Sequence, residues 1–478
     1  MRSSQESPFV RMTPWQRLGV AGILSSFLLW IGFQQLIHPS SLTTMGWVFL
    51  ALAGNIGLML VPLVFYQPSY GWFHPLIFGI VFSLLNHLRR ADTYIHGLQW
   101  HAGLPGWSPD SLTLLLVYEL VLRAISLMSW YFGFFLSPPL RLPQLKFGQP
   151  RHLGSKVLLV VLFSFVVFAA YMQKRGGITS HILSWGRGRT TELAGEFYWQ
   201  FVIQFGLLAC LSWLILDRNS VLRPLFWGCT LMSVGFMFLS SGSRSSAIYF
   251  MILGLIAWLL RERKIQITKI IGITFLGLFL LGILGNFRDS TYDGEINWAA
   301  LMGAAPNDAV DESALSSGLG EVTNRSSVFA GVFPILALVP NDVDFLYGSS
   351  YLAVLTLPVP RGLWPAKPSL IAGMVGETFF NVNVGMPPGS IGEAYWNFGL
   401  PGVLMVFFCF GAFCKGLATS FEQYAGEPAV IVLYAIALFL FPEPTGLSAI
   451  DLLLKEIPAF LFLWSTGAIA IGPPNRSP

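Results

Sequence analysis

KVLLVVLFSFVVFAAYM (Lys156–Met172) carries the strongest fold signal in this chain, because sixteen residues without a charge follow its first lysine. A helix needs about 20 mostly apolar residues to cross the roughly 30 Å hydrocarbon core of a bilayer. We therefore predict a membrane-spanning helix here. The same pattern recurs along the chain and gives twelve predicted spans: residues 18–37, 45–66, 72–88, 112–136, 156–172, 197–216, 224–240, 246–260, 268–285, 399–418, 429–441 and 452–471.

The composition agrees with this prediction. The chain has 478 residues, of which 54% are hydrophobic and only 11% charged, and its mean hydropathy is +0.63. An ordinary soluble domain carries about 25% charged residues, so a soluble protein of this length would need a charged exterior that is missing here. We predict an all-α polytopic membrane protein with about 12 transmembrane helices and a large extracytoplasmic loop that contains short interfacial helices.

Several classes of protein are disfavoured by the sequence. The net charge of +4 is too small to indicate nucleic-acid binding. The four cysteines lie inside apolar runs without paired CxxC spacing, which argues against a disulfide framework and a metal site. No P-loop, GxGxxG or GxSxG motif is present, so we expect no cofactor, no ATP-driven transport and no serine hydrolysis. The apolar run 18–37 is too long for a signal-peptide core, and we interpret it as a retained first span.

Basic loops predict the orientation in the membrane. Residues 141–156 and 261–269 are strongly basic, and such loops favour the cytoplasmic side, so we place both termini in the cytoplasm. Three parts follow: an N-terminal transmembrane bundle (1–285, about nine spans) with a basic outer loop (173–196), a large extracytoplasmic loop (286–398) and C-terminal transmembrane helices (399–478, about three spans). The apolar runs 327–340 and 351–359 are too short to span a bilayer and predict interfacial or re-entrant helices.

The large outer loop contains two turn-rich motifs, VPRGLWPAKPS (Val359–Ser369) and GMPPGSIGEAYWNFGLPG (Gly385–Gly402). An arginine fork matches phosphate oxygens and a lysine adds a point charge, while aromatic faces suit sugar rings. A carboxylate just before a span lies at the membrane–water boundary. The candidates are Arg361, Lys367, Trp364, Tyr395, Trp396 and Glu393. The alternative is a snorkelling arginine, an interfacial aromatic belt and an ordinary surface glutamate.

Further basic residues gather on the same predicted side. SSGSRSSAIYF (Ser240–Phe250) places Arg244 in a small-residue turn at the start of a helix, where backbone N–H groups and the helix dipole favour an anion. A simple tight turn is the alternative. The outer loops add Arg187, Arg189 and Arg288 as candidate anion ligands, although Arg187 and Arg189 also fit a solvated loop. Inside a span, Glu119 and Arg123 are spaced i, i+4, which favours a structural ion pair over a proton path.

Taken together, SGSR at a helix start, PRGLWPAKP, and PPGSIGEAYWNFGLPG before a span resemble the Wzy-type family of O-antigen and exopolysaccharide polymerases. The arrangement of about a dozen spans with one large late outer loop is also similar to that family. The resemblance implies a membrane glycosyltransferase in the bacterial inner (plasma) membrane. Its substrate would be an oligosaccharide repeat unit on undecaprenyl pyrophosphate. Membrane lipids, a chain-length regulator and export proteins are the implied partners, and nucleic acid is not.

The resemblance also implies roles for the candidate residues. Arg244 and Arg361 would stabilise the departing lipid pyrophosphate, and Glu393 would deprotonate the acceptor hydroxyl. Glu377 is the competing carboxylate in the same loop. The implied substrate-binding residues are Lys367, Arg288, Arg187, Arg189, Trp364, Tyr395, Trp396 and Glu377.

Other functions remain open from the sequence. An O-antigen-ligase-like glycosyltransferase would use the same donor with another acceptor, and the residues do not separate the two. A transporter or flippase for lipid-linked sugar would be expected to have charges spread through its spans and repeated halves, and no repeat is visible. A structural scaffold of an export complex would not need arginines and a glutamate together. We therefore favour the enzyme.

Overall fold

The computed structural model describes residues 13–37, 43–66, 68, 70–139, 145–184, 196–242, 244–262, 267–289, 331–356, 359, 363–364, 367–382, 385–424 and 426–471, and these fold almost entirely into helices. The first half of the chain forms α1 (Pro14–Ile37), α2 (Met45–Phe65), η1 (Gly71–Phe73), α3 (Pro75–Arg89), α4 (Ala91–His96), α5 (Pro109–Leu136), β1 (Leu145–Phe147), α6 (Leu153–Lys174), α7 (Ile178–Ser184), α9 (Phe197–Ile203), α10 (Phe205–Leu216), η3 (Ser220–Leu222) and α11 (Pro224–Ser241). The second half forms α12 (Arg244–Glu262), α13 (Ile267–Asp289), α16 (Val332–Leu338), α17 (Ser349–Leu355), α18 (Ile371–Phe380), α19 (Gly389–Gln423), α20 (Pro428–Leu440), α21 (Gly446–Thr466) and β2 (Ile469–Ile471).

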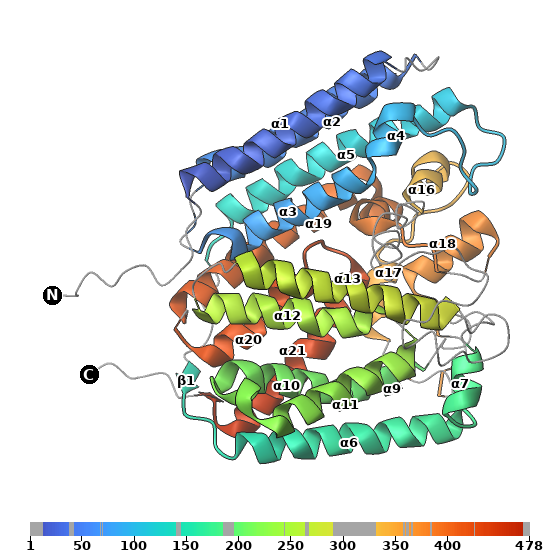
Figure 1. The fold of residues 1–478 in the computed structure, drawn as a ribbon. Coiled ribbons are helices and arrows are strands. Elements are labelled where there is room, and N and C mark those ends of the chain that lie inside the picture. The colour runs from blue at the N-terminus through green and yellow to red at the C-terminus, as the bar shows by residue number, and fades with distance from the viewer. Residues whose placement is uncertain are drawn as a thin grey trace.

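The long helices lie side by side in a bundle with two distinct ends (Figure 1). At one end, which we call the strand end, β1 pairs antiparallel with β2, and Lys146 lies opposite Ala470. At the other end, which we call the short-helix end, lie α7, α16 and α18. The loops that the sequence analysis places on opposite sides of a membrane therefore follow helices that point to opposite ends of the bundle.

Seven helical segments in the described part of the chain are long and apolar enough to cross a membrane: Pro14–Ile37, Met45–Phe65, Pro109–Leu136, Leu153–Lys174, Tyr198–Leu216, Pro224–Ser241 and Gly389–Gln423. Their outer faces carry large apolar side chains, such as Leu29 of α1 and Leu159 of α6, which are 72% and 65% exposed. A broad apolar surface of this kind is unfavourable in water and matches a hydrocarbon environment. These helices support an all-α membrane protein.

Each of the twelve apolar stretches identified in the sequence overlaps a helix or, at residues 197–216, the pair α9 and α10. Not all of these helices have the length of a full span. The helices α3 and α20 contain 15 and 13 residues, so at 1.5 Å rise they extend roughly 20 Å, short of the roughly 30 Å core. Such helices can lie in a membrane where the ends of their backbone are buried by neighbouring protein.

Glycines bring α5 and α19 into direct backbone contact. A Cβ atom at Gly133 of α5 would lie 2.0 Å from the Phe408 carbonyl oxygen, and one at Gly411 of α19 would lie 2.2 Å from the Trp130 carbonyl oxygen. Small residues at a helix crossing allow this approach, which maximises packing where no hydrophobic effect acts between helices. The crossing joins the N-terminal and C-terminal helices through a shared core.

The helix α19 is broken near its first third. Phe398 and Gly399 have non-helical backbone angles, and Gly399 has a positive φ of 63°, which glycine adopts without a Cβ clash. Pro401 follows and has no N–H to donate to the Asn397 carbonyl. Instead, the Tyr347 N–H donates to the Asn397 carbonyl at 3.2 Å, and the Leu346 N–H donates to the Trp396 carbonyl at 3.0 Å. The segment before α17 therefore satisfies the carbonyls that the break releases.

Short helices occur where the sequence predicted them. The helix α16 falls within the run 327–340, and α17 overlaps the run 351–359. The structure adds α18, a ten-residue helix between the motifs Val359–Ser369 and Gly385–Gly402. Phe379 of α18 packs edge-to-face against Trp396 of α19, with ring centroids 4.9 Å apart. The short helices thus pack onto the first part of α19.

Candidate functional site

Glu393 lies on α19 before the break and is 1% exposed. Its Oε1 accepts a hydrogen bond from the Ser350 hydroxyl of α17 at 3.0 Å, and its Oε2 accepts one from the Gly446 N–H of α21 at 3.0 Å. The carboxylate therefore connects three helices, and the alternative of an ordinary surface glutamate is wrong. A buried carboxylate needs such donors, because an unpaired one would carry a large desolvation cost.

Asn397 extends this arrangement one turn along α19. Its Nδ2 donates to the Ser350 hydroxyl at 2.8 Å and to the Glu393 carbonyl at 2.7 Å, while its Oδ1 accepts from the Gly348 N–H at 2.8 Å. The Ser350 hydroxyl thus accepts from Asn397 and donates to Glu393. This Ser350–Glu393–Asn397 cluster fixes the start of α17 against α19.

The two aromatic candidates next to Glu393 occupy different environments. The Trp396 side chain is 2% exposed, and its Nε1 donates to the Asp344 carbonyl at 3.1 Å. Tyr395 is half-buried, and its hydroxyl accepts a hydrogen bond from the Tyr118 hydroxyl at 3.2 Å. Only Tyr395 therefore presents part of its surface outside the protein core.

Three further candidates from residues 359–402 fall within the described part of the chain. The Lys367 ammonium donates to the Val359 carbonyl at 3.0 Å. Trp364 is 42% exposed, and Glu377 lies exposed on α18. Arg361 lies outside the described residues, so its position relative to Glu393 is not assigned.

The start of the basic loop 173–196 contacts the end of α11, which precedes the SGSR segment, at the short-helix end. His181 of α7 is 1% exposed, and its Nε2 lies 3.2 Å from the Ser240 carbonyl at the end of α11. The Arg175 Nε donates to the Nδ1 of the same ring at 3.3 Å. Arg244 begins α12 immediately after this turn. Two candidate anion-binding segments that are about sixty residues apart in sequence are thus held together.

The remaining basic candidates are only partly placed. Arg288 falls in the last turn of α13, and its side chain is outside the described part of the structure. Arg187 and Arg189 also fall outside the described residues. In the described part of loop 173–196, Lys174 donates to Glu196 at 2.6 Å, and the Arg175 Nη1 lies 3.8 Å from the other oxygen of Glu196. Two cations of this loop therefore already have a carboxylate partner.

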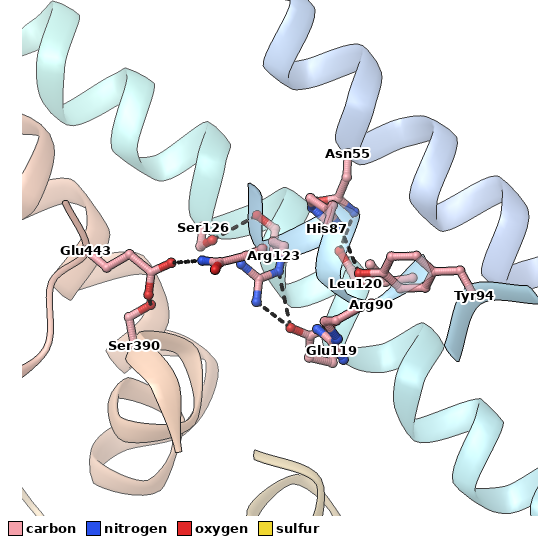
Figure 2. Close-up of polar contacts among 11 residues, drawn as sticks. Asn55, His87, Arg90, Tyr94, Glu119, Leu120, Arg123, Ser126, Ser390 and Glu443 are labelled. Carbon is pink, nitrogen blue, oxygen red and sulfur yellow. Dashed lines mark hydrogen bonds and ion pairs between the residues drawn. The ribbon is translucent and has the colours of Figure 1, made fainter. Parts of the chain in front are cut away.

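A second polar cluster lies inside the bundle, and Figure 2 shows it. The Arg123 Nη2 donates to the Glu119 Oε1 at 2.6 Å, which confirms the ion pair predicted from their spacing. The Arg90 Nη1 donates to the other oxygen of Glu119 at 3.1 Å. Glu119, Arg90 and Arg123 are 1%, 4% and 8% exposed. Arg90, from the turn between α3 and α4, and Arg123 of α5 therefore share one buried carboxylate.

Glu443, in the turn between α20 and α21, completes this cluster. Its Oε1 accepts from the Asn86 Nδ2 of α3 at 3.1 Å, and its Oε2 accepts from the Ser390 hydroxyl of α19 at 3.2 Å (Figure 2). Glu443 is half-buried. It also lines a cavity of about 20 Å³, large enough for about one water molecule, together with Arg123, Ser126, Ser390 and Ser83.

Sequence reasoning missed Arg90 and Glu443 as interior residues. The predicted span 72–88 ends before Arg90, which leaves this residue in a loop, but α4 begins at Ala91 and Arg90 is buried between the two helices. The signal for Glu443 is its place in FPEPTG, a carboxylate between two prolines at the end of an apolar run. An ionisable residue at such a position is a functional candidate by default.

The described residues contain no group of three or more His, Cys, Asp or Glu side chains that could hold a metal ion. Chemically, the described residues offer a buried, hydrogen-bonded carboxylate at Glu393. They also offer a separate interior charge cluster around Glu119.

Comparison with curated proteins and with solved structures gives no match. A family model does match residues 194–439, more than half of the chain, from α9 through α20. The match includes the SGSR segment and the motifs Val359–Ser369 and Gly385–Gly402, the second of which contains Glu393. The chain therefore belongs to the family described as "Domain of unknown function (DUF8712)".

Proposed function

We propose that this chain is a membrane glycosyltransferase that joins oligosaccharide repeat units, carried on undecaprenyl pyrophosphate, into a bacterial surface polysaccharide. The observation that supports it most is the 3.2 Å contact between His181 Nε2 and the Ser240 carbonyl. It holds α7, at the start of the basic loop 173–196, against the end of α11, where the SGSR segment begins. A departing pyrophosphate needs several cations in one place, because charge develops on it as its bond to the sugar breaks.

The proposed reaction requires no nucleotide. The acceptor hydroxyl of one unit attacks the anomeric carbon of the donor sugar, and the bond from that carbon to the lipid pyrophosphate breaks. The pyrophosphate leaves with the bonding electron pair, and the hydroxyl proton passes to a carboxylate. In this scheme Arg244, Arg361, Lys367, Arg288, Arg187 and Arg189 bind the pyrophosphate.

Glu393 is the proposed general base. The Ser350 hydroxyl donates to its Oε1 at 3.0 Å, and an acceptor hydroxyl would make the same kind of contact before losing its proton. In our proposal the acceptor takes the place of Ser350, which requires α17 to move from its contact with α19. Tyr395, Trp396 and Trp364 would hold the sugars, with Trp396 becoming available only in that displaced arrangement.

The proposed setting is the bacterial inner membrane. About twelve crossings would place the short-helix end and residues 286–398 outside, with both termini in the cytoplasm. The separation of β1 from α7, α16 and α18 along the bundle supports this assignment (Figure 1). Membrane lipids, a chain-length regulator and export proteins are the proposed partners.

The general base is tested by comparing two variants in which a glutamate is replaced by glutamine. Glu393→Gln keeps the shape and can still accept from Ser350, but it cannot take up a proton. We expect unpolymerised repeat units to accumulate at normal protein levels, because a general base contributes about 10²–10⁴-fold. Polymer length is read on gels of extracted polysaccharide.

Glu377→Gln is the matched control, since Glu377 is an exposed carboxylate of the same loop. Normal polymer from Glu393→Gln together with lost polymer from Glu377→Gln would assign the base to Glu377. If both variants form polymer of normal length, neither Glu393 nor Glu377 is the general base.

Two other functions are compatible with part of these observations. A ligase-like enzyme would use the same donor, and the identity of the acceptor separates it from a polymerase. A transporter of lipid-linked sugar is favoured by one observation, the interior cluster of Arg90, Glu119, Arg123 and Glu443, because charges within a bundle mark many transport pathways. If the protein in liposomes moves a labelled lipid-linked sugar from one leaflet to the other and forms no polymer, the transporter is supported.

A further inference from the structure

The interior cluster of Arg90, Glu119, Arg123 and Glu443 is neutral when all four residues are ionised. Arg90 and Arg123 share Glu119, so these three residues alone carry a net charge of +1. An uncompensated charge inside a helical bundle is costly, and a half-satisfied cluster is worse than an apolar one. Glu443 supplies the missing negative charge.

The geometry around Glu443 fits an ionised carboxylate. One oxygen accepts from Asn86 and the other from Ser390, at 3.1 and 3.2 Å, so both oxygens act as acceptors. Glu443 and Arg123 line the same small cavity of about 20 Å³. A cavity of that size with polar groups on its walls fits one bridging water molecule.

We propose that Glu443 and Arg123 form a water-bridged ion pair that positions the first part of α19, and with it Glu393, against the turn between α20 and α21. This turn contacts α19 at two points. Glu443 accepts from Ser390, and the Gly446 N–H donates to Glu393. Ser390 and Glu393 are spaced i, i+3 and lie on one face of the helix. Displacement of the turn therefore changes the surroundings of both residues.

The ion pair is tested by a double-mutant cycle on the full-length protein in detergent. Glu443→Gln leaves the cluster at +1, and Arg123→Gln leaves it at −1, whereas the double variant is neutral because Arg90 still pairs with Glu119. We expect each single variant to unfold at a lower temperature than the parent, and the double variant to unfold at a higher temperature than either. The coupling should be about tenfold in the unfolding equilibrium constant.

A double variant that unfolds no higher than the more stable single variant would overturn the ion pair. Asp451→Asn is the matched control, because Asp451 pairs with Lys455 on α21 outside the cluster. Combining it with Arg123→Gln should give an additive loss. This measurement does not depend on the reaction, so it stays informative if the proposed glycosyltransferase activity is wrong.

The proposed role of Glu443 in positioning Glu393 rests on the proposed function. It is tested by a measurement that a change in stability alone would not alter. In Glu443→Gln we expect the acid side of the pH profile of polymer formation to move by about one unit, the effect of about one altered charge-assisted hydrogen bond. Asp451→Asn should leave the profile in place. A Glu443→Gln profile that is only scaled down, with its acid side unmoved, would restrict Glu443 to a stabilising role.

Discussion

His181 shows how a single residue can join two segments of the proposed anion site. Its Nδ1 accepts from Arg175, so its Nε2 must carry the proton that bonds the Ser240 carbonyl. The imidazole is therefore neutral. Burial, and next the charge of Arg175, lower the pKa of His181 from its ordinary value of 6.5. Protonation would place a second N–H against the Arg175 guanidinium and break that contact.

The first prediction is a pH dependence of this anchor. Because the native pKa is lowered, the contact is fully present above about pH 6.5 and weakens as the pH falls below that value. Hydrogen exchange of the α7 amides, compared at pH 8 and pH 5 after correction for intrinsic rates, should show lost protection at pH 5. His181→Gln should show the same weak protection at both values. Equal protection in the parent protein at pH 8 and 5 would refute the assignment.

The candidate site was only partly predictable at this scale. Glu393 stands out in the sequence as a carboxylate next to aromatic residues before a span, but its burial depends on Ser350 and Gly446, which are 43 and 53 residues away. The i, i+4 spacing predicts the pair of Glu119 and Arg123. Local spacing carries no information about Arg90 or Glu443, because their partners come from other helices.

At the scale of elements, the crossing of α5 and α19 holds the two halves of the chain together. Our second prediction concerns Gly133, where an alanine methyl would lie 2.0 Å from the Phe408 carbonyl oxygen. Because backbone atoms meet there, the helices must separate, and overpacking typically costs about 1–3 kcal/mol. Thermal unfolding of Gly133→Ala in detergent should show this loss.

Gly57→Ala on α2 is the control for this substitution. A Cβ at Gly57 meets nothing within 4 Å, and alanine is the better helix former, so stability should be unchanged or higher. If Gly133→Ala unfolds at the same temperature as Gly57→Ala, the close backbone contact does not exist in solution.

The positions of the helices could be predicted from the lengths of the apolar runs. The residues at which the helices begin and end were predicted less well. The sequence predicted a span beginning at residue 399, whereas α19 begins at Gly389 and breaks at Phe398 and Gly399. The string NFGLPG indicates a turn. In the structure it becomes a break within a helix, because the N–H groups of Leu346 and Tyr347 bond the released carbonyls. That compensation comes from a distant segment, so no local pattern could have predicted it.

At the scale of the whole molecule, the account requires that the two ends of the bundle face opposite sides of a membrane. Our third prediction uses single cysteines in a background without the four native ones. Thr378→Cys on α18 should react with an impermeant maleimide in intact cells, since that position is exposed at the short-helix end. Asn219→Cys, which is exposed between α10 and α11, should react only after permeabilisation.

The reverse labelling pattern would invert the orientation and would place the proposed chemistry in the cytoplasm. Labelling of both positions in intact cells would contradict a membrane between the two ends. The native Cys409 is exposed on α19 and must be replaced before either experiment.

The central claim is that this chain polymerises lipid-linked repeat units by itself. The most direct measurement is reconstitution of the purified protein in liposomes with an undecaprenyl-pyrophosphate-linked oligosaccharide as the only added substrate. We predict a ladder of products spaced by one repeat unit, with one undecaprenyl pyrophosphate released for each new linkage. Intact substrate after incubation with folded protein would contradict the claim, as would substrate that has only moved to the other leaflet.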